Sequence, residues 1–569
     1  MTMLIGESLP RPDALGKVTG AAHYPGDLVQ PSMLHLKVVF AHRPHARIVS
    51  IDTSAALQHP GVVAVLTAAD VPFNSYGLIE NDQPALCGDV VRFEGDKVAL
   101  VVAETKEAAA VGARLVAVEY EDMPAVTDPR AALAPNAPLV HAERGTNTLL
   151  HVPIRKGDVA RGFAEADVIV EGEFSTSWQE HAFLQPEAGI AYMDDEGRVV
   201  IETAGQWLHE DRRQIALILQ IPEEQVVVRY AAIGGAFGGR EDLSIQHLLA
   251  LAAWKLRRPV ALVWSREESI IGHHKRHPFV IRSKWGAKHD GTITAVEAEV
   301  IADGGAYAST SAEVIKIATL FSNGCYEVPN IKADGYAVYT NNIPSGAFRG
   351  FGSPQNQFAA EIMVTRLAHA LGMDPIELRR RNIYREGSIE SSQQPLPPGV
   401  SAPQVLERCV QEMQERLQIA DCKLQTGDPQ STIYNLQSAI RRGWGMACGI
   451  KNVGYSFGYP EQATATVELH GGAQIERAVV RAGIAEVGQG AHLAMRMIAA
   501  EALGLPPDAI TMITDDSSET PNAGSVSASR MTLMGGRAIH DAALAARREW
   551  DNEERPARAT VQFRPSATT

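Results

Sequence analysis

Glycine-rich loops that precede helical segments are the feature that most constrains this chain. Four such stretches lie far apart in the sequence: GGAFGGRED (234–242), GAFRGFGSPQ (346–355), EVGQGAH (486–492) and PNAGSVSASRMTLMGG (521–536). Glycine permits positive φ and close backbone approach, and a helix start presents free N–H groups to an anion. The first loop matches neither a P-loop nor the G-x-G-x-x-G pattern. Each loop alone reads as a helix entry turn, but together they predict a long anionic cofactor lying between several helix starts.

Composition and charge exclude several classes of protein. The chain has 569 residues, 45% of them hydrophobic, with a formal net charge of -15, which argues against a nucleic-acid-binding surface. No C-x-x-C pair occurs, so zinc ribbons and iron–sulfur clusters have no support. The scattered cysteines are Cys87, Cys325, Cys409, Cys422 and Cys448. With no signal peptide and no long apolar run in the sequence, we expect a cytoplasmic protein without a membrane span.

The chain divides into three mixed α/β units. Residues 1–130 contain strand-like apolar runs such as KVALVVAE, and the Pro/Ala-rich stretch PRAALAPNAPLV that follows is typical of a linker. Residues 150–390 contain a predicted helix in QNQFAAEIMVTRLAHALG, which ends at Gly372. Residues 391–440 form a polar connector with one helix. The third unit, 441–569, ends in a polar tail without an evident core pattern, which predicts an incomplete domain.

Several long motifs occur in a familiar order. LPRPDALGKVTGAAHYPGDL near the N-terminus, WQEHAFLQPEAGIA and the four loops together resemble the molybdopterin-binding large subunit of the xanthine oxidase and aldehyde oxidase family, the molybdenum hydroxylases. The resemblance implies a mixed α/β fold. It implies an α/β hammerhead domain over 1–130, a first molybdopterin-binding domain over 150–390, a connector over 391–440 and an incomplete second molybdopterin-binding domain over 441–569.

The resemblance assigns catalytic roles to three residues. Gln206 matches the glutamine whose amide reaches an oxo ligand of molybdenum, although a surface glutamine at a helix start is the simpler reading. Glu241 matches the acid that orients a heterocyclic substrate, and its alternative is a solvated carboxylate. Arg349 matches the arginine whose backbone lies beside the metal, and its alternative is a phosphate contact or a structural ion pair.

The resemblance also implies the walls of the site. Phe351 and Phe457 match two phenylalanines that sandwich a planar substrate, although a core phenylalanine at 457 is nearly as plausible. The resemblance further implies that the metal is held by the cofactor's dithiolene and by no protein side chain. The remaining cofactor-binding positions are Gly235, Phe237, Gly238, Gly488, Gln489, Gly490, Ser527, Ala528 and Ser529.

The implied activity is oxidation of a purine-like aromatic N-heterocycle or an aldehyde, with water as the oxygen source. The cofactor is molybdopterin or its cytosine dinucleotide form, while 2Fe-2S clusters and FAD are expected on partner chains. Ile317 stands where xanthine-oxidising members have a second arginine, which puts xanthine itself in doubt. The loop 346–355 lacks the cysteine of the carbon monoxide dehydrogenase branch, and Arg240 replaces a usual lysine.

One family motif is missing from this sequence. The general base of the family is a glutamate in a Gly-x-Gly-Glu loop near the C-terminus, and no such loop occurs here. A separate chain carrying the loop, a truncation and a true loss all remain open. The second hypothesis for function is therefore a catalytically inactive paralogue or a cofactor-binding assembly subunit. A third is an α/β binding protein whose glycine loops are structural.

Overall fold

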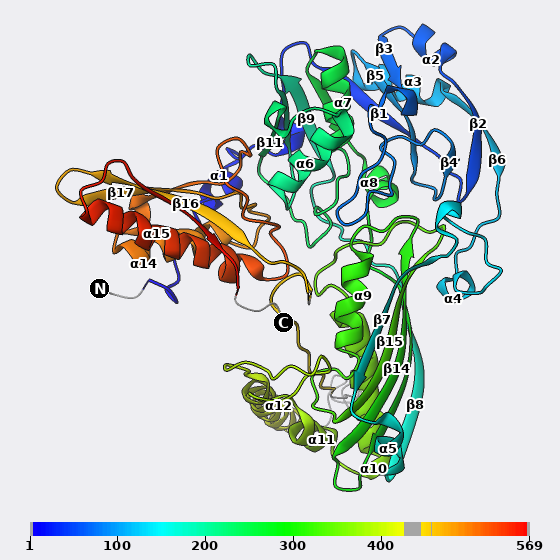
Figure 1. Ribbon diagram of the computed structural model, residues 1–569, viewed down its shortest axis with the longest axis vertical. Coiled ribbons are helices and arrows are strands. Elements are labelled where there is room, and N and C mark those ends of the chain that lie inside the picture. Colours follow the sequence, from blue (N-terminus) through cyan, green and yellow to red (C-terminus); the bar gives the residue numbers. More distant parts are fainter. Residues whose placement is uncertain (1–3, 426–444, 457, 566–569) are drawn as a thin grey trace.

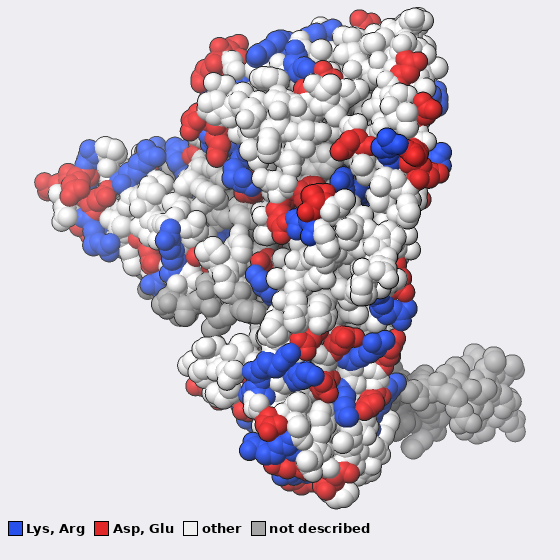
Figure 2. Space-filling model, turned by 45° about the vertical axis from the view of Figure 1, so that its right-hand side comes forward, with Lys and Arg blue, Asp and Glu red and all other residues white. Residues whose placement is uncertain are grey.

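A computed structural model describes residues 4–425, 445–456 and 458–565. The described residues form four sheets arranged in three lobes (Figure 1). No helix in this part of the chain is both long and apolar enough to cross a lipid bilayer. Acidic and basic side chains are interspersed over the face in Figure 2, and this face shows no continuous basic surface of the kind that binds nucleic acid.

The largest sheet joins the first two predicted units. Its seven strands run β11-β10-β9-β12-β1-β5-β3, and β1 pairs in parallel with β12 through Leu34 and Val260. Strand β5, which lies between β1 and the edge strand β3, is buried along its whole length, as the apolar run after Lys97 predicts. The strands are β1 Leu34–Phe40, β3 Val62–Leu66, β5 Lys97–Ala103, β9 Ala188–Met193, β10 Val199–Thr203, β11 Val226–Tyr230 and β12 Val260–Val263.

Short helices pack around this sheet. A small three-stranded sheet, β4-β2-β6, completes the N-terminal part with strands β2 Ala46–Asp52, β4 Val90–Val91 and β6 Ala117–Asp122. The helices are α2 Ser54–Gln58, α3 Lys106–Leu115, α6 Leu208–Leu219, α7 Gln246–Leu256 and α8 Arg266–Gly272. Helix α1, Ala14–Thr19, has no buried residue and lies apart from them.

A five-stranded sheet forms the lower lobe of Figure 1 and supports the loop 346–355. Its order is β7-β15-β14-β13-β8, with β14 and β15 parallel and the other pairs antiparallel. Helix α10 ends at Gly372, whose φ of 65° gives the predicted C-terminal stop. The elements are β7 Thr148–Lys156, β8 Val168–Thr176, β13 Phe279–Ala287, β14 Ile293–Gly305, β15 Asn330–Tyr339, α5 Val159–Ala164, α9 Ser311–Leu320, α10 Ser353–Leu371, α11 Pro375–Asn382 and α12 Ala402–Gln425.

The predicted linker at 129–140 is wrong in part. Helix α4, Pro129–Ala132, begins at Asp128, whose side chain accepts from the Arg130 N–H. Val126, Ala132 and Val140 are buried with residues of β15 in a small core of their own. The stretch contains turn-forming prolines, but its Ala132 and Val140 pack against the sheet.

The C-terminal tail is also not coreless, contrary to the prediction. Strand β19 pairs along β16 from Ala463–Phe563 to Leu469–Ala557. Its sequence ARATVQF alternates apolar and polar residues, and Ala557 and Ala559 are buried under α15. The third lobe consists of β16 Ala463–Gly471, β17 Ile475–Arg481, β18 Ile510–Ile513, β19 Ala557–Phe563, α14 Ala491–Leu503 and α15 Gly536–Asp551.

Candidate active site

All four loops meet at one cavity of about 740 Å³. Gln206 and Glu241 line it together with backbone from the loops 234–242 and 346–351, and the third lobe closes the other side. The residues from that lobe belong to the loops 487–491 and 526–532 and to the segment around Tyr455. The convergence predicted from the glycine loops is therefore present, although the loop 234–242 is followed by a turn before α7 begins.

Gln206 connects the loops through its amide group. Its Oε1 accepts from the backbone N–H groups of Gly238 (3.1 Å) and Arg240 (3.2 Å), and its Nε2 donates to the Val526 carbonyl (2.9 Å). The residue is buried, so the simpler reading as a surface glutamine is wrong. Val526 uses one of the two amide hydrogens, and the residue lines the cavity.

The loops 234–242 and 346–351 hold each other by backbone contacts. The Arg349 N–H donates to the Phe237 carbonyl at 2.9 Å, and the Arg349 carbonyl accepts from Arg276 Nη2 at 2.9 Å. Gly238 has φ 104°, and a Cβ there would lie 2.7 Å from the Ala347 carbonyl oxygen. Only glycine therefore fits where the backbone of loop 234–242 crosses that of loop 346–351. The Phe237 side chain is 47% exposed and can contact a ligand.

Arg240 supports this loop from behind. Its Nε donates to the Gly235 carbonyl and its Nη2 to the Gln185 carbonyl, while its guanidinium lies 4.0 Å from the Phe183 ring centre. Burial lowers the pKa of Arg240 to about 10. The charge at this position therefore orders the backbone and does not line the cavity.

Glu241 is a buried carboxyl at the wall of the cavity. It is 1% exposed, and its Oε2 accepts from the Tyr455 hydroxyl at 2.7 Å. Burial raises the pKa of Glu241 to about 7, and the hydrogen bond from Tyr455 opposes this rise. The alternative of a solvated carboxylate is wrong. Its neighbour Asp242 faces Ser309 instead, and burial raises its pKa to about 7 as well.

The aromatic wall is defined in part. Phe351 lines the cavity in the left-handed conformation (φ 52°), and its ring packs against Tyr455 with centroids 5.1 Å apart. Phe457, the expected second wall, lies outside the described residues. Ile317 is buried in α9 among apolar residues and does not line the cavity. Tyr455 was missed by the sequence reasoning, because it lies 214 residues from its partner Glu241.

The loop 486–492 caps helix α14 with its own acid. Glu486 Oε1 accepts from the N–H groups of Gly488 (3.0 Å) and Gly490 (2.9 Å), and Arg11 pairs with the same carboxylate at 3.1 Å. Gln489 folds back, with its Oε1 accepting from the Val487 N–H. An anionic ligand at this helix start would compete with Glu486 for these amides.

The loop 527–529 is held by a buried ion pair. Ala528 (φ 49°) and Ser529 (φ 56°) are both left-handed, which is uncommon away from glycine. Arg530 pairs with Glu461 at 2.7 Å, and its Nη1 donates to the Ala523 and Ser525 carbonyls. The Ala528 carbonyl accepts from the Gly454 N–H, which joins this loop to the segment that carries Tyr455.

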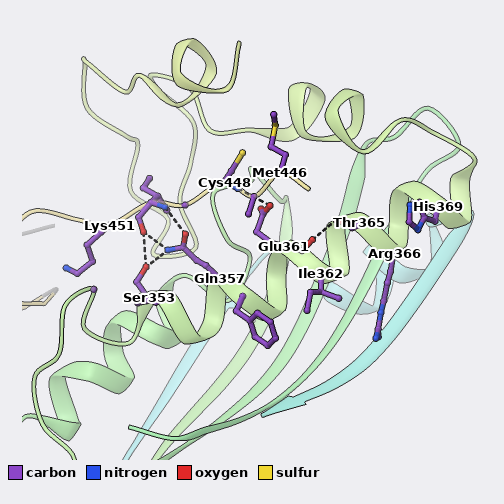
Figure 3. A pocket seen from close by; sticks show the side chains of 16 residues that line it. Ser353, Gln357, Glu361, Ile362, Thr365, Arg366, His369, Met446, Cys448 and Lys451 are labelled. Carbon is purple, nitrogen blue, oxygen red and sulfur yellow. Dashed lines mark hydrogen bonds between the residues drawn. The ribbon is translucent and has the colours of Figure 1, made fainter. Parts of the chain in front are cut away.

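A second cavity, of about 840 Å³, adjoins the first (Figure 3). It lies between α10 and the segment 446–451, and Gly350 and Lys451 line both cavities. Glu361 accepts from the Cys448 N–H, and Gln357 accepts from the Ile450 N–H. Burial lowers the pKa of Lys451 to about 8. These contacts attach the segment leading to Tyr455 to the lower lobe.

Comparison with known proteins identifies the family. Residues 19–124 match the aldehyde oxidase and xanthine dehydrogenase a/b hammerhead domain, and residues 140–383 and 421–561 match molybdopterin cofactor-binding domains. The chain belongs to the molybdenum hydroxylase family as a molybdopterin-binding large subunit. The fold predicted from the sequence, a hammerhead domain followed by cofactor-binding domains, is confirmed.

Individual relatives are enzymes of this kind. The chain is 37% identical to a probable xanthine dehydrogenase subunit of Bacillus subtilis, over 93% of this chain and 68% of that protein. It is 39% identical to the nicotinate dehydrogenase large molybdopterin subunit of Eubacterium barkeri, over 71% of this chain and 95% of that subunit. The solved aldehyde oxidoreductase from Desulfovibrio gigas superposes with a TM-score of 0.90 at 31% identity, over 99% of this chain and 63% of that one.

Proposed function

We propose that this chain is the molybdenum-cofactor-binding subunit of a hydroxylase that oxidises a planar N-heterocycle or an aldehyde, with water as the oxygen source. The observation that carries the proposal is the single cavity at which four loops, a buried glutamine amide and a buried carboxyl converge. The relatives are named as dehydrogenases and oxidoreductases, which disfavours the inactive paralogue.

The residues that line the cavity fit a large anionic cofactor. The Gly238 crossing leaves no room for a Cβ, so a ligand can lie directly against this backbone. We assign Gln206, Gly235, Phe237, Gly238 and the Arg349 backbone to the metal end of the cofactor. Its pterin and phosphate end is assigned to Gly488, Gln489, Gly490, Ser527, Ala528 and Ser529. When bound, the cofactor supplies the two-electron redox chemistry that oxidises a carbon of the substrate.

The protein's own side chains bind and orient the substrate. With a pKa of about 7, Glu241 carries a proton in slightly acidic conditions and none in slightly basic ones. It can therefore donate to a ring nitrogen or accept from a ring N–H at near-neutral pH. Phe351 supplies one apolar wall against which a flat ring can stack. These groups suit a planar heterocycle better than an aliphatic aldehyde.

Electrons must leave through groups that this chain does not provide. Only five cysteines occur, none in a cluster-binding pattern, so we assign 2Fe-2S clusters and FAD to partner subunits. We further propose a cytoplasmic location and a molybdopterin or molybdopterin cytosine dinucleotide cofactor.

The test is metal analysis and turnover of the complex purified from its native host. We expect about one molybdenum per chain and dye reduction that depends on hypoxanthine, nicotinate or an aromatic aldehyde. Glu241→Gln is expected to retain molybdenum and to lose most of the turnover with heterocycles. Molybdenum without turnover on any of these substrates would favour the inactive paralogue, and absence of molybdenum would leave a structural role for the loops.

A further inference from the structure

A second cluster of metal-ligand side chains lies behind the cavity. It consists of Glu180, His181 and His273, whose three ligand atoms all lie within 4.8 Å of one another. His273 Nε2 is 3.2 Å from His181 Nδ1 and 3.4 Å from Glu180 Oε1. Both histidines are buried, and the Glu180 side chain, 22% exposed, connects the cluster to solvent.

The hydrogen bonds of the two imidazoles determine their tautomers. His181 Nε2 lies 2.8 Å from the Ala347 carbonyl, and His273 Nδ1 lies 2.6 Å from the Ser269 carbonyl. A carbonyl only accepts, so each of these nitrogens carries the ring's proton. The two remaining nitrogens, 3.2 Å apart, therefore direct lone pairs at each other.

Two of the three separations between these atoms, those from His273 Nε2, fit a tetrahedral cation, and the third is within 4.8 Å. Two ligand atoms that each lie about 2.05 Å from a zinc ion are about 3.3 Å apart at the tetrahedral angle. The observed separations of 3.2 and 3.4 Å bracket that value. Neutral imidazole nitrogens with a carboxylate oxygen are also a donor set that zinc accepts.

The residues around the cluster make the hydrogen bonds that usually orient the ligands of a metal ion. Ligating histidines usually donate their other N–H to a carbonyl or carboxylate, as both rings do here. Lys275 Nζ lies 2.6 Å from Glu180 Oε2, while Oε1 accepts from the Ala182 N–H at 3.2 Å and lies 3.4 Å from His273 Nε2. Glu187, 2% exposed, lies 3.5 Å from His273 Nδ1, and within the described chain neither of its oxygens has a hydrogen-bond partner. A cation beyond the imidazole would stabilise this buried carboxyl electrostatically.

We propose that Glu180 Oε1, His181 Nδ1 and His273 Nε2 bind a zinc ion, with a fourth position open to water. The site is distinct from the cofactor cavity and contributes no side chain to it. The bound ion would stabilise the loop 346–351, because His181 donates to Ala347 and its ring stacks on Phe348 at 4.2 Å. Gly239 makes room for the same ring, since a Cβ there would lie 2.8 Å from it.

The test measures zinc and molybdenum separately in the complex purified from its native host. We expect about one zinc per wild-type chain after dialysis, and at least a tenfold loss in Glu180→Gln and in His273→Gln. His277→Gln is the matched control, because His277 is equally buried in the same segment but contacts Ser311 instead. After chelation, Co²⁺ added to the wild-type protein should give visible absorption bands that Glu180→Gln lacks.

The outcomes are separable from those of the proposed function. Zinc retention in both ligand variants, or wild-type protein with neither zinc nor a cobalt spectrum, would overturn the site. Glu180→Gln keeps the size of a partly exposed side chain, so its loss of zinc with an unchanged circular dichroism spectrum cannot be ascribed to unfolding. Zinc without molybdenum would support this site and refute the cofactor assignment. Molybdenum with neither zinc nor a cobalt spectrum would support the cofactor assignment and refute this site.

Discussion

Replacement of Glu241 by glutamine should make the protein more stable, but only at alkaline pH. Burial raises the pKa of Glu241 from 4.5 to about 7. The folded state therefore binds more protons than the unfolded state between these values, and stability falls as pH rises through this window. The penalty is absent below about pH 4.5 and complete above about pH 7. Glutamine has the same size and no charge, so the variant escapes the penalty.

The size of the effect follows from the shift. A rise of about 2.5 pKa units corresponds to about 3 kcal/mol of lost stability once the carboxyl is ionised. The glutamine oxygen can still accept from Tyr455, but its NH₂ group needs a new acceptor, which costs about 1 kcal/mol. We therefore expect Glu241→Gln to gain about 2 kcal/mol at about pH 8.5 and to lose about 1 kcal/mol at about pH 4.5, where only the cost of the NH₂ group remains. For a domain of this size the gain raises the melting temperature by about 4 °C.

The assay is thermal unfolding of variant and wild type at a common scan rate, from about pH 4.5 to about pH 8.5. Asp242 titrates in both proteins, so the difference between them removes most of its contribution. Glu224→Gln, at an exposed position, is the control and should show no pH-dependent difference. A melting difference for Glu241→Gln that is constant across the pH range would refute the argument that a buried carboxyl ionises here.

Three further changes test the architecture of the site. Gly238→Ala places a Cβ 2.7 Å from a backbone carbonyl at φ 104°, so we expect a loss of about 1–3 kcal/mol and a lower molybdenum content, measured by melting and elemental analysis. Arg530→Ala leaves a buried carboxylate unpaired and should cost about 3–5 kcal/mol in chemical denaturation, whereas exposed Arg537→Ala should cost almost nothing. Tyr455→Phe removes a hydrogen bond that lowers the pKa of Glu241, so the pH dependence of substrate turnover should shift to higher pH, and an unshifted profile would contradict the contact.

Local features of the site were predictable from the sequence, and long-range ones were not. Glycine requirements are local, so the loops 234–242 and 346–355 could be located without a structure. The pairing of Glu241 with Tyr455 spans 214 residues, and no local pattern encodes it. The parallel pairing of β1 with β12, which joins the first two predicted units in one sheet, is equally non-local.

The strand at the C-terminus was predictable and was nevertheless missed. ARATVQF alternates apolar and polar residues, with alanine at two of the inward positions. Because these side chains are small and the neighbouring residues are polar, the segment was predicted to be a tail without a core. Alanines suffice there because α15 packs closely over β16 and β19. Where a helix covers a strand, the alternation of apolar and polar residues therefore identifies the strand better than the overall apolar content of the segment does.

Backbone strain indicates that the cavity is built for a ligand. Phe237, Phe351, Ala528 and Ser529 have positive φ values without being glycine, and all four line the cavity. Each such residue costs about 1–3 kcal/mol and persists only where its surroundings hold it. Here the surroundings are the Gln206 amide, the Arg349 backbone contact and the Arg530–Glu461 pair, which come from different lobes. A cavity that concentrates strain from separate loops, and holds it with buried polar groups, is arranged in advance for the molecule that it binds.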